Sequence, residues 1–237
     1  ILIKRKEVKV TVESTLALIV KVVVLQFNQV KLDKKFIMKI SMEGSSVINL
    51  EQLSLYQDSL GYLGQQMNFP EKMTFHPKIF EETISKSHPG YEDLLAYREV
   101  MMNYTLSEIK AIYTDTFDFS KKHPLYMTFN KFDTQKERGQ MLAKLKVLYE
   151  MFGLKMVDNE LSDFLPLMLQ FLQVADFKND SRAQENLQLV IMIIEDGTYE
   201  MANTLAENNN PYAYVVSALR KTLKACIVPL KEVENHA

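Results

Sequence analysis

The chain has 237 residues, of which 47% are hydrophobic, and this is enough to bury one substantial core. Its single cysteine, Cys226, excludes an intrachain disulfide framework and a cysteine metal cluster, and it suits a reducing compartment, so we expect a cytoplasmic protein. No segment reaches the roughly 18 consecutive apolar residues that a membrane span requires, so we expect no membrane insertion.

Composition and charge further limit the fold class and the kinds of partner that we expect. Gly and Pro are scarce, at seven each, which favours helices over a turn-rich β architecture. Residues 1–46 hold nine Lys or Arg and four Asp or Glu, whereas residues 47–237 hold 19 and 26. An acidic remainder of this kind argues against nucleic acid and favours basic partners, although acidity also simply keeps a protein soluble.

The first 46 residues differ from the rest of the chain. Their Val-rich runs have the composition of strands, and Lys21 interrupts the apolar stretch that a signal peptide would need. Met42-Glu43-Gly44 back-translates to a ribosome-binding sequence, and Val47 could be a GTG initiator. We therefore interpret residues 1–46 as a non-native extension translated from upstream of the true start. The alternative is a genuine extension that adds a strand or a tail.

From Ile48 onward, apolar side chains recur at helical spacing between helix-breaking residues. Thr105 and Glu108 have the spacing of a capping box, in which each side chain binds an unpaired amide of the first helical turn. Thr134 and Glu137 repeat this spacing at the start of the clearest helix, which we expect over residues 134–152, with Gly153 as its left-handed C-cap.

Three further helix starts follow. Ser162 or Asp163 is expected to be an N-cap that leaves Pro166 in the first turn, where no amide donor is lost. Ser181 and Gln184 are expected to cap the next helix, and Pro211 opens the last one, which Pro229 ends. These patterns predict an all-α, single-domain helical bundle over residues 47–228, with a polar tail at residues 229–237.

The sequence offers little catalytic chemistry. The four histidines are scattered without metal-ligand spacing, and the seven glycines form no phosphate-binding loop. We therefore expect no metal and no cofactor. Glu160 and Asp163 could share one helix face as a general acid/base pair, but carboxylates at a helix N-terminus are more simply explained as caps.

An ordered set of motifs resembles a known family. The motifs are Tyr113-Thr114-Asp115-Thr116-Phe117-Asp118, Leu125-Tyr126-Met127-Thr128-Phe129, Arg138-Gly139 before the long helix, and Glu160-Leu161-Ser162-Asp163-Phe164-Leu165-Pro166. Together they resemble the NarJ family of nitrate reductase delta subunits, within the TorD-like group of molybdoenzyme chaperones. Two positions depart from the family pattern: Phe132-Asp133 stands where Gly-Asp is usual, and Ser162 replaces a proline.

The resemblance implies a chaperone of the NarJ/TorD type that is not an enzyme. Such a protein would bind the N-terminal segment of the catalytic alpha subunit of respiratory nitrate reductase, and it would permit molybdenum cofactor insertion before membrane attachment. According to this interpretation, an acidic rim borders a hydrophobic groove that receives the segment. The apolar residues of the groove could equally belong to the core, because any helical bundle buries apolar stripes of this kind. The expected peptide-binding residues are Tyr126, Phe129, Asp133, Arg138, Leu142, Leu145, Tyr149, Glu160 and Asp163. The alternatives are a TorD-like chaperone of another molybdoenzyme, of the dimethyl sulfoxide or trimethylamine N-oxide reductase type, and a helical enzyme that uses Glu160 and Asp163.

Overall fold

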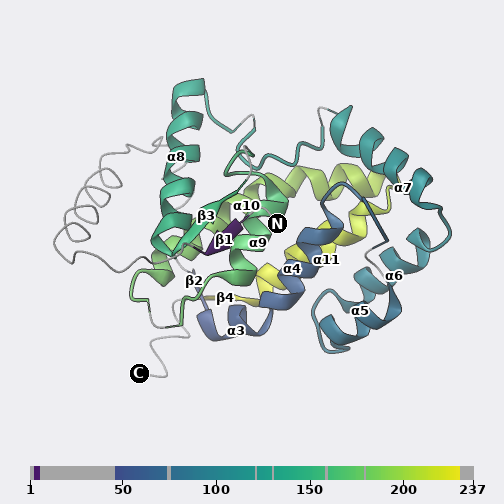
Figure 1. The fold of residues 1–237 in the computed structure, drawn as a ribbon, viewed down its shortest axis with the longest axis horizontal. Coiled ribbons are helices and arrows are strands. Elements are labelled where there is room, and N and C mark those ends of the chain that lie inside the picture. Colours follow the sequence, from purple (N-terminus) through teal and green to yellow (C-terminus); the bar gives the residue numbers. More distant parts are fainter. Residues whose placement is uncertain are drawn as a thin grey trace.

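In the computed structural model, the residues described are 3–5, 46–73, 76–120, 122–129, 131–157, 160–178 and 180–229. Helices account for most of them, which confirms the predicted all-α class (Figure 1). The helices are α3 (Leu50–Leu55), α4 (Gln57–Gln66), α5 (Pro77–Thr83), α6 (Tyr91–Met101), α7 (Leu106–Tyr113), the π-helix η1 (Thr114–Asp118), α8 (Gln135–Met151), α9 (Leu165–Val174), α10 (Ala183–Glu207) and α11 (Tyr212–Ala225).

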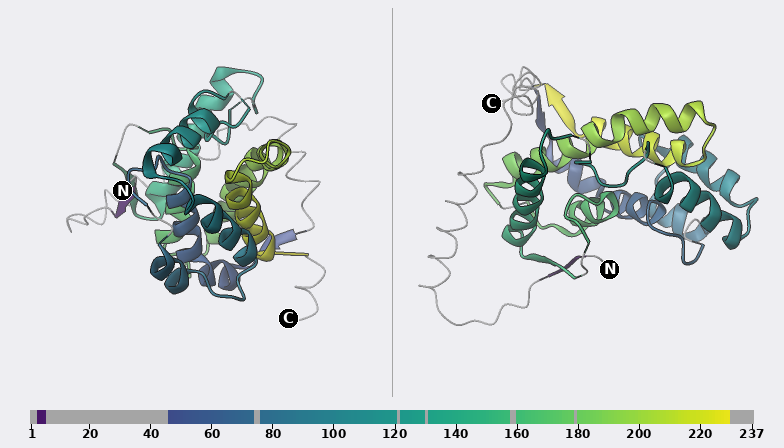
Figure 2. Two further views of the ribbon diagram at one scale, coloured as in Figure 1. Left: turned by 90° about the vertical axis from the view of Figure 1, so that its right-hand side faces the viewer. Right: turned by 90° about the horizontal axis from the view of Figure 1, so that it is seen from above.

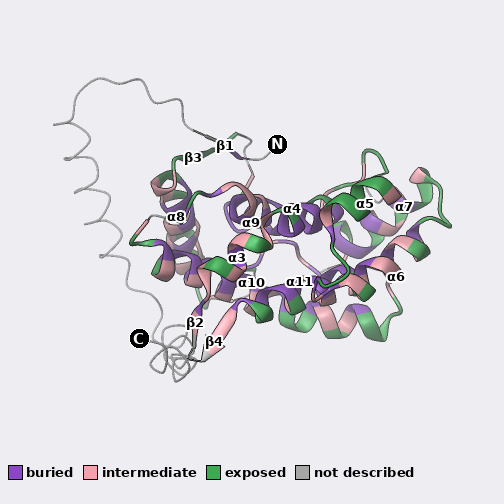
Figure 3. Cartoon of the chain, turned by 90° about the horizontal axis from the view of Figure 1, so that it is seen from below, coloured by how far each residue is buried: buried purple, intermediate pink, exposed green. Residues whose placement is uncertain are grey.

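Helices α4, α9, α10 and α11 form the middle of the molecule. In this region α4 packs on α9 and α10 packs on α11, while α11 also contacts α6. Helices α5, α6 and α7 lie at one end of the molecule and α8 lies at the other (Figures 1 and 2). The inward faces of the central helices are buried (Figure 3).

Helix α9 is the most hydrophobic element of the bundle. Its sequence, LPLMLQFLQV, is apolar on nearly every side, and a helix of this kind has to be covered on more than one face. Seven of its ten residues are buried, among them Phe171 and Leu172. The burial of α9 explains why the segment that begins with Glu160 leads into the centre of the fold.

The caps of α7 and α8 confirm the predictions made from spacing. The hydroxyl oxygens of Thr105 and Thr134 accept from the backbone N–H groups of Glu108 and Glu137, and each glutamate carboxylate accepts from the backbone N–H of its threonine. After α8, Gly153 has φ +72°, the left-handed conformation expected of a C-cap glycine. These ends depend on contacts only three residues apart, which is why the sequence predicts them.

Two other predictions about helix ends were wrong or incomplete. Helix α10 begins after Arg182, its N-cap residue, which makes no side-chain cap bond. The Asp180 carboxylate accepts from the backbone N–H of Arg182 at 2.9 Å and forms an ion pair with its guanidinium. Ser181 and Gln184 therefore do not cap this helix. Helix α11 begins after Pro211, as predicted, but it ends at Ala225 and is followed by a strand that includes Pro229.

Within the described ranges, four short strands form two antiparallel pairs. Strand β2 (Ser46–Ile48) pairs with β4 (Ile227–Pro229), and β1 (Ile3–Arg5) pairs with β3 (Leu154–Met156). A strand at residues 3–5 is what the alternative interpretation of the first 46 residues would produce. Because residues 6–45 and 230–237 lie outside the described part of the chain, the domain boundary at residue 46 and the polar tail stay predictions.

Candidate functional site

The segments that carry the resemblance come together in one hydrogen-bonded cluster. An antiparallel bridge joins Tyr126 to Phe164, so the segment before α8 lies alongside the segment before α9. The backbone N–H of Leu165 donates to the carbonyl oxygen of Leu125 at 2.7 Å on one side of this bridge. The N-terminal half of α8 covers the cluster through the side chain of Arg138.

Asp163 is the centre of this cluster and is fully buried. Its Oδ2 atom accepts from the backbone N–H of Thr128 at 3.0 Å, from the hydroxyl of Thr128, and from the guanidinium of Arg138 at 3.3 Å. The Arg138 Nε–H also donates to the Thr128 hydroxyl oxygen at 3.3 Å. Three donors therefore compensate the loss of water around the carboxylate.

This geometry corrects two predictions about Asp163. It is not an exposed carboxylate on an acidic rim, because its charge points into the fold toward Thr128 and Arg138. It is also not a helix cap: α9 has Phe164 as its N-cap residue and makes no side-chain cap bond. Ser162 does not cap α9 either, since its hydroxyl donates to the carbonyl oxygen of Leu142 on α8 at 2.7 Å. Pro166 does lie in the first turn of α9, as predicted.

Glu160 lies nearer the surface and has a different partner. The Tyr126 hydroxyl donates to Glu160 Oε1 at 3.1 Å, and the backbone N–H of Leu161 donates to the same oxygen at 2.9 Å. Partial burial, reinforced by this carboxylate, raises the pKa of Tyr126 to about 12. Because Glu160 and Asp163 bind separate donors, the structure gives no support to an acid/base pair made of these two residues.

The predicted groove residues divide into core and surface. Leu145 and Tyr149 are completely buried, and the Tyr149 hydroxyl donates to the carbonyl oxygen of Ser162 at 2.7 Å. Burial raises the pKa of Tyr149 well above its usual value. Both residues belong to the core, as expected of a bundle stripe, and neither side chain is available to a partner at the surface.

The remaining predicted residues are accessible to different degrees. Tyr126, Leu142 and Arg138 are half-buried, Phe129 is 37% exposed, and Asp133 lies exposed in the turn before α8. The Arg138 guanidinium lies 5.9 Å from the centre of the Phe129 ring, within range of a cation–π contact. An accessible surface of mixed aromatic and charged character therefore lies directly over the buried Asp163 network.

Sequence reasoning missed two contributors to this site, Lys131 and Gly197. The Lys131 ammonium forms an ion pair with Asp196 on α10 at 3.1 Å. The next residue, Gly197, allows close approach: a Cβ atom there would lie 2.6 Å from Met127 Sδ and 3.0 Å from Met127 Cα. A glycine within an otherwise apolar helical stripe was the signal that could have revealed this contact.

The structure also tests for metal and membrane features. Within the described ranges, no group of three or more His, Cys, Asp or Glu residues is arranged to hold a metal ion. Two histidines serve the fold: His88 accepts from the Gly90 backbone N–H at 3.1 Å, and His123 bonds the Thr204 hydroxyl at 2.9 Å. Among the helices that the structure describes, none is long and apolar enough to cross a membrane.

Comparison with known proteins identifies the family. The nitrate reductase delta subunit family matches residues 86–216. The probable nitrate reductase molybdenum cofactor assembly chaperone NarJ of Bacillus subtilis is 33% identical over 133 residues, which cover 56% of this chain and 68% of the relative. The probable nitrate reductase molybdenum cofactor assembly chaperone NarW of Escherichia coli is 27% identical over 135 residues, which cover 57% of this chain and 56% of the relative.

A third relative covers a smaller share of a longer protein. The nitrate reductase-like protein NarX of Mycobacterium tuberculosis is 26% identical over 143 residues, which are 55% of this chain and 21% of that protein.

The region that matches the family, residues 86–216, includes Thr128 and Arg138, together with Asp163. The family is one of chaperones, which confirms the prediction that this protein is not an enzyme. The chain belongs to the nitrate reductase delta subunit family, as its motifs had indicated.

Proposed function

We propose that this protein is a cytoplasmic assembly chaperone for nitrate reductase, which binds the N-terminal segment of the catalytic alpha subunit and permits molybdenum cofactor insertion before membrane attachment. The observation that carries this proposal is the family match over residues 86–216, which includes all the residues of the Asp163 cluster. The relatives named NarJ and NarW are described as molybdenum cofactor assembly chaperones of nitrate reductase.

The surface above the cluster supports binding of a basic, amphipathic segment. Phe129 and Leu161 are exposed apolar side chains, which a partner could cover. Glu160, the half-buried residue before Leu161, and Asp133, exposed in the turn before α8, supply carboxylates in a chain whose residues 47–237 have an excess of acidic residues. Apolar contacts would then hold the segment, while the carboxylates mainly accelerate its association.

The first experiment is co-purification with separate candidate clients. The full-length chain should retain the nitrate reductase catalytic subunit and fail to retain it when the N-terminal segment of that subunit is deleted. Retention of a dimethyl sulfoxide or trimethylamine N-oxide reductase instead would favour the alternative TorD-like assignment. If neither client is retained, the proposed function is wrong.

A titration with a synthetic N-terminal peptide then locates the surface. Affinity should fall as salt rises, because charges at an exposed surface are screened over roughly 8 Å at physiological ionic strength. Asp133→Asn should mainly slow association, with Asp58→Asn on the exposed face of α4 as its control. Phe129→Ala should mainly speed dissociation, with exposed Leu55→Ala as its control. Equal effects of a variant and its control would place binding elsewhere on the molecule.

A further inference from the structure

Arg98 differs from other arginines of this fold in its electrostatic partners. It lies half-buried on α6, at the end of the molecule that α5, α6 and α7 form (Figure 1). Its guanidinium carbon lies 5.5 Å from the centre of the Phe80 ring, and no carboxylate of the described residues pairs with it. Three other arginines each form an ion pair with a carboxylate, namely Arg138, Arg182 and Arg220. The charge of Arg98 is therefore left uncompensated within the described part of the chain.

Tyr62 on α4 places a second hydrogen-bond donor close to this guanidinium. Its side chain is only 2% exposed, and its ring packs edge to face on Phe80, with 6.2 Å between the ring centres. The Tyr62 hydroxyl and the Nε atom of Arg98 are both buried, and neither has a hydrogen-bond partner among the described residues. Burial raises the pKa of Tyr62, and the charge of Arg98 opposes that rise. Two donors without partners thus lie against the same phenylalanine ring.

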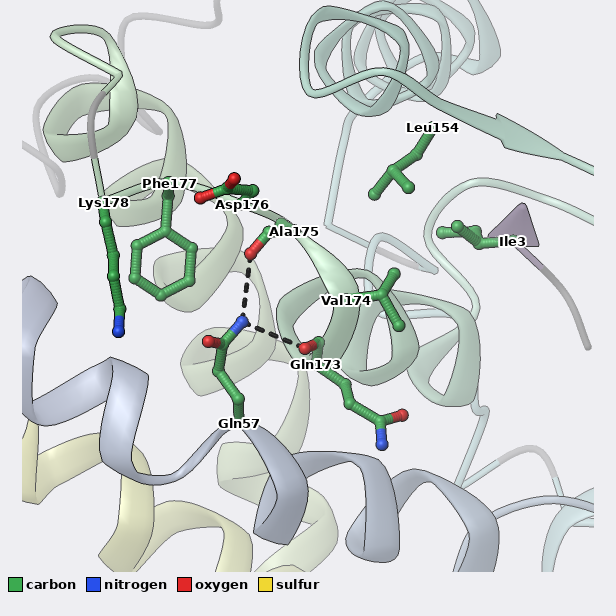
Figure 4. Close-up of a pocket in the computed structure, with 9 residues that line it drawn as sticks. All are labelled: Ile3, Gln57, Leu154, Gln173, Val174, Ala175, Asp176, Phe177 and Lys178. Atoms are coloured by element: carbon green, nitrogen blue, oxygen red, sulfur yellow. Dashed lines mark hydrogen bonds between the residues drawn. The ribbon is translucent and has the colours of Figure 1, made fainter. Parts of the chain in front are cut away.

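Polar side chains at a comparable depth elsewhere in the fold do have partners. Beside the pocket at the end of α9, the Nε2 atom of Gln57 donates to the carbonyl oxygens of Gln173 and Ala175, each at 3.0 Å (Figure 4). The hydroxyl of the fully buried Tyr149 donates to a backbone carbonyl oxygen at 2.7 Å. A buried donor without a partner has lost its water and gained no bond in return. Two such donors at one place indicate a site for a ligand that accepts hydrogen bonds.

Charge and size narrow the choice of that ligand. A water molecule can accept from both Arg98 and Tyr62, but it leaves the guanidinium charge uncompensated. A carboxylate supplies negative charge and two acceptor oxygens in one plane, which match the planar fork of a guanidinium. Because both donor atoms are covered by the fold, a small anion fits the requirement better than a bulky one.

We propose that Arg98 and Tyr62 form a binding site for a small carboxylate anion of the size of formate or acetate. The Arg98 guanidinium donates to the carboxylate oxygens, the Tyr62 hydroxyl donates to the same anion, and the Phe80 ring supports the guanidinium from its face. Because the two donors belong to α6 and α4, the bound anion joins these helices and stabilises the fold. The site lies at the opposite end of the molecule from α8 (Figure 1), and the proposal does not depend on the proposed function.

Thermal unfolding of the full chain in sodium formate, compared with sodium chloride at equal ionic strength, tests this site. A dissociation constant of about 10 mM would raise Tm by roughly 3–6 °C in about 100 mM formate. Tyr62→Phe should keep the Tm of the wild type in chloride, because it removes a hydroxyl without a partner, and it should lose at least about half of the formate response. Arg98→Met should lose the response completely.

A matched control separates a specific site from a general effect of the salt. Arg182→Met also removes an arginine, and it breaks an ion pair, but it should keep the full formate response. If Arg98→Met does not fold, Arg98→Lys keeps the charge without the planar fork and should respond less than the wild type. Relaxation of carbon-13-labelled formate should show one saturable site per chain in the wild type and none in Tyr62→Phe at the same concentrations. An absent formate response in the wild type, or an equal response in the wild type and both site variants, overturns the proposal and leaves water as the acceptor.

Discussion

Replacing Asp163 by Asn tests the buried network at the centre of the motif cluster. The substitution keeps the shape of the side chain but removes the charge that faces Arg138. Each hydrogen bond to a charged acceptor contributes about 1.5–3 kcal/mol, against about 0.5–1.5 kcal/mol for a neutral one. Complete burial of both partners would raise the loss to about 3–5 kcal/mol, but the Arg138 side chain remains 18% exposed and can regain some water. We therefore expect a loss of about 2–3 kcal/mol.

A second feature of the network supports this estimate. Oδ1 of Asp163 has no hydrogen-bond partner among the described residues. In the Asn variant the amide oxygen has to remain near the Thr128 donors, so the amide nitrogen occupies the unpartnered position. The variant then buries an unpaired donor in place of an unpaired acceptor and gains no compensating bond.

Thermal and urea unfolding of a double-mutant cycle measures this effect. A loss of 2–3 kcal/mol corresponds to a fall in Tm of roughly 5–10 °C for a chain of this size. Arg138→Met alone should also destabilise, and the double variant should lose less than the sum, with a coupling of about 1–3 kcal/mol. Asp133→Asn is the control, because that carboxylate is exposed. Coupling near zero, or a melt of Asp163→Asn equal to wild type, would refute the reasoning.

Three other substitutions test packing and protonation. Gly197→Ala should destabilise the fold by about 1–3 kcal/mol, because the new Cβ atom meets Met127. Gly139→Ala in α8 should instead stabilise it by about 0.5–1 kcal/mol, because no atom lies within 4 Å of the new Cβ atom. Urea unfolding midpoints of the two variants that shift in the same direction contradict this. Burial lowers the pKa of His88 from 6.5 to about 4, so the unfolded chain takes up a proton at this histidine before the folded chain does. Up to about 3 kcal/mol of stability that is present above pH 6.5 is therefore lost as the pH falls to 4. His88→Gln should flatten that part of the stability–pH curve, and an unchanged curve would exclude His88 as its source. Leu145→Ala should cost about 2–5 kcal/mol in the same unfolding assay, because the side chain is fully buried, and an unchanged midpoint would mean that it is not packed in the core.

The elements that the sequence predicted well are those with local causes. The capping boxes at Thr105 and Thr134 depend on side chains three residues away, and Gly153 needs only its own backbone freedom. The apolar stripe of α8 likewise indicated a buried face, but it did not separate core from groove: Leu145 and Tyr149, expected to bind peptide, lie in the core. Each of these inferences needs only the geometry of one helix.

The role of Asp163 could not be predicted in the same way. Its donors lie on Thr128, 35 residues earlier, and on Arg138, 25 residues earlier, and only the folded chain brings them together. From sequence alone, a carboxylate just before an apolar run resembles a helix cap or an exposed binding residue. The alternatives differ in burial, which depends on tertiary packing and not on local pattern.

The position of the motif residues also limits which of them can belong to the proposed binding surface. The motif residues Thr128 and Asp163 are buried and partnered within the fold, so they shape the surface without being accessible to a peptide. Gly139 is different: it lies exposed in the interior of α8, where alanine would stabilise the helix and would contact nothing. The fold therefore gives no reason for a glycine at this position. Close approach of a partner backbone would supply one, and it would extend the proposed binding surface from Phe129 across Arg138 onto this face of α8.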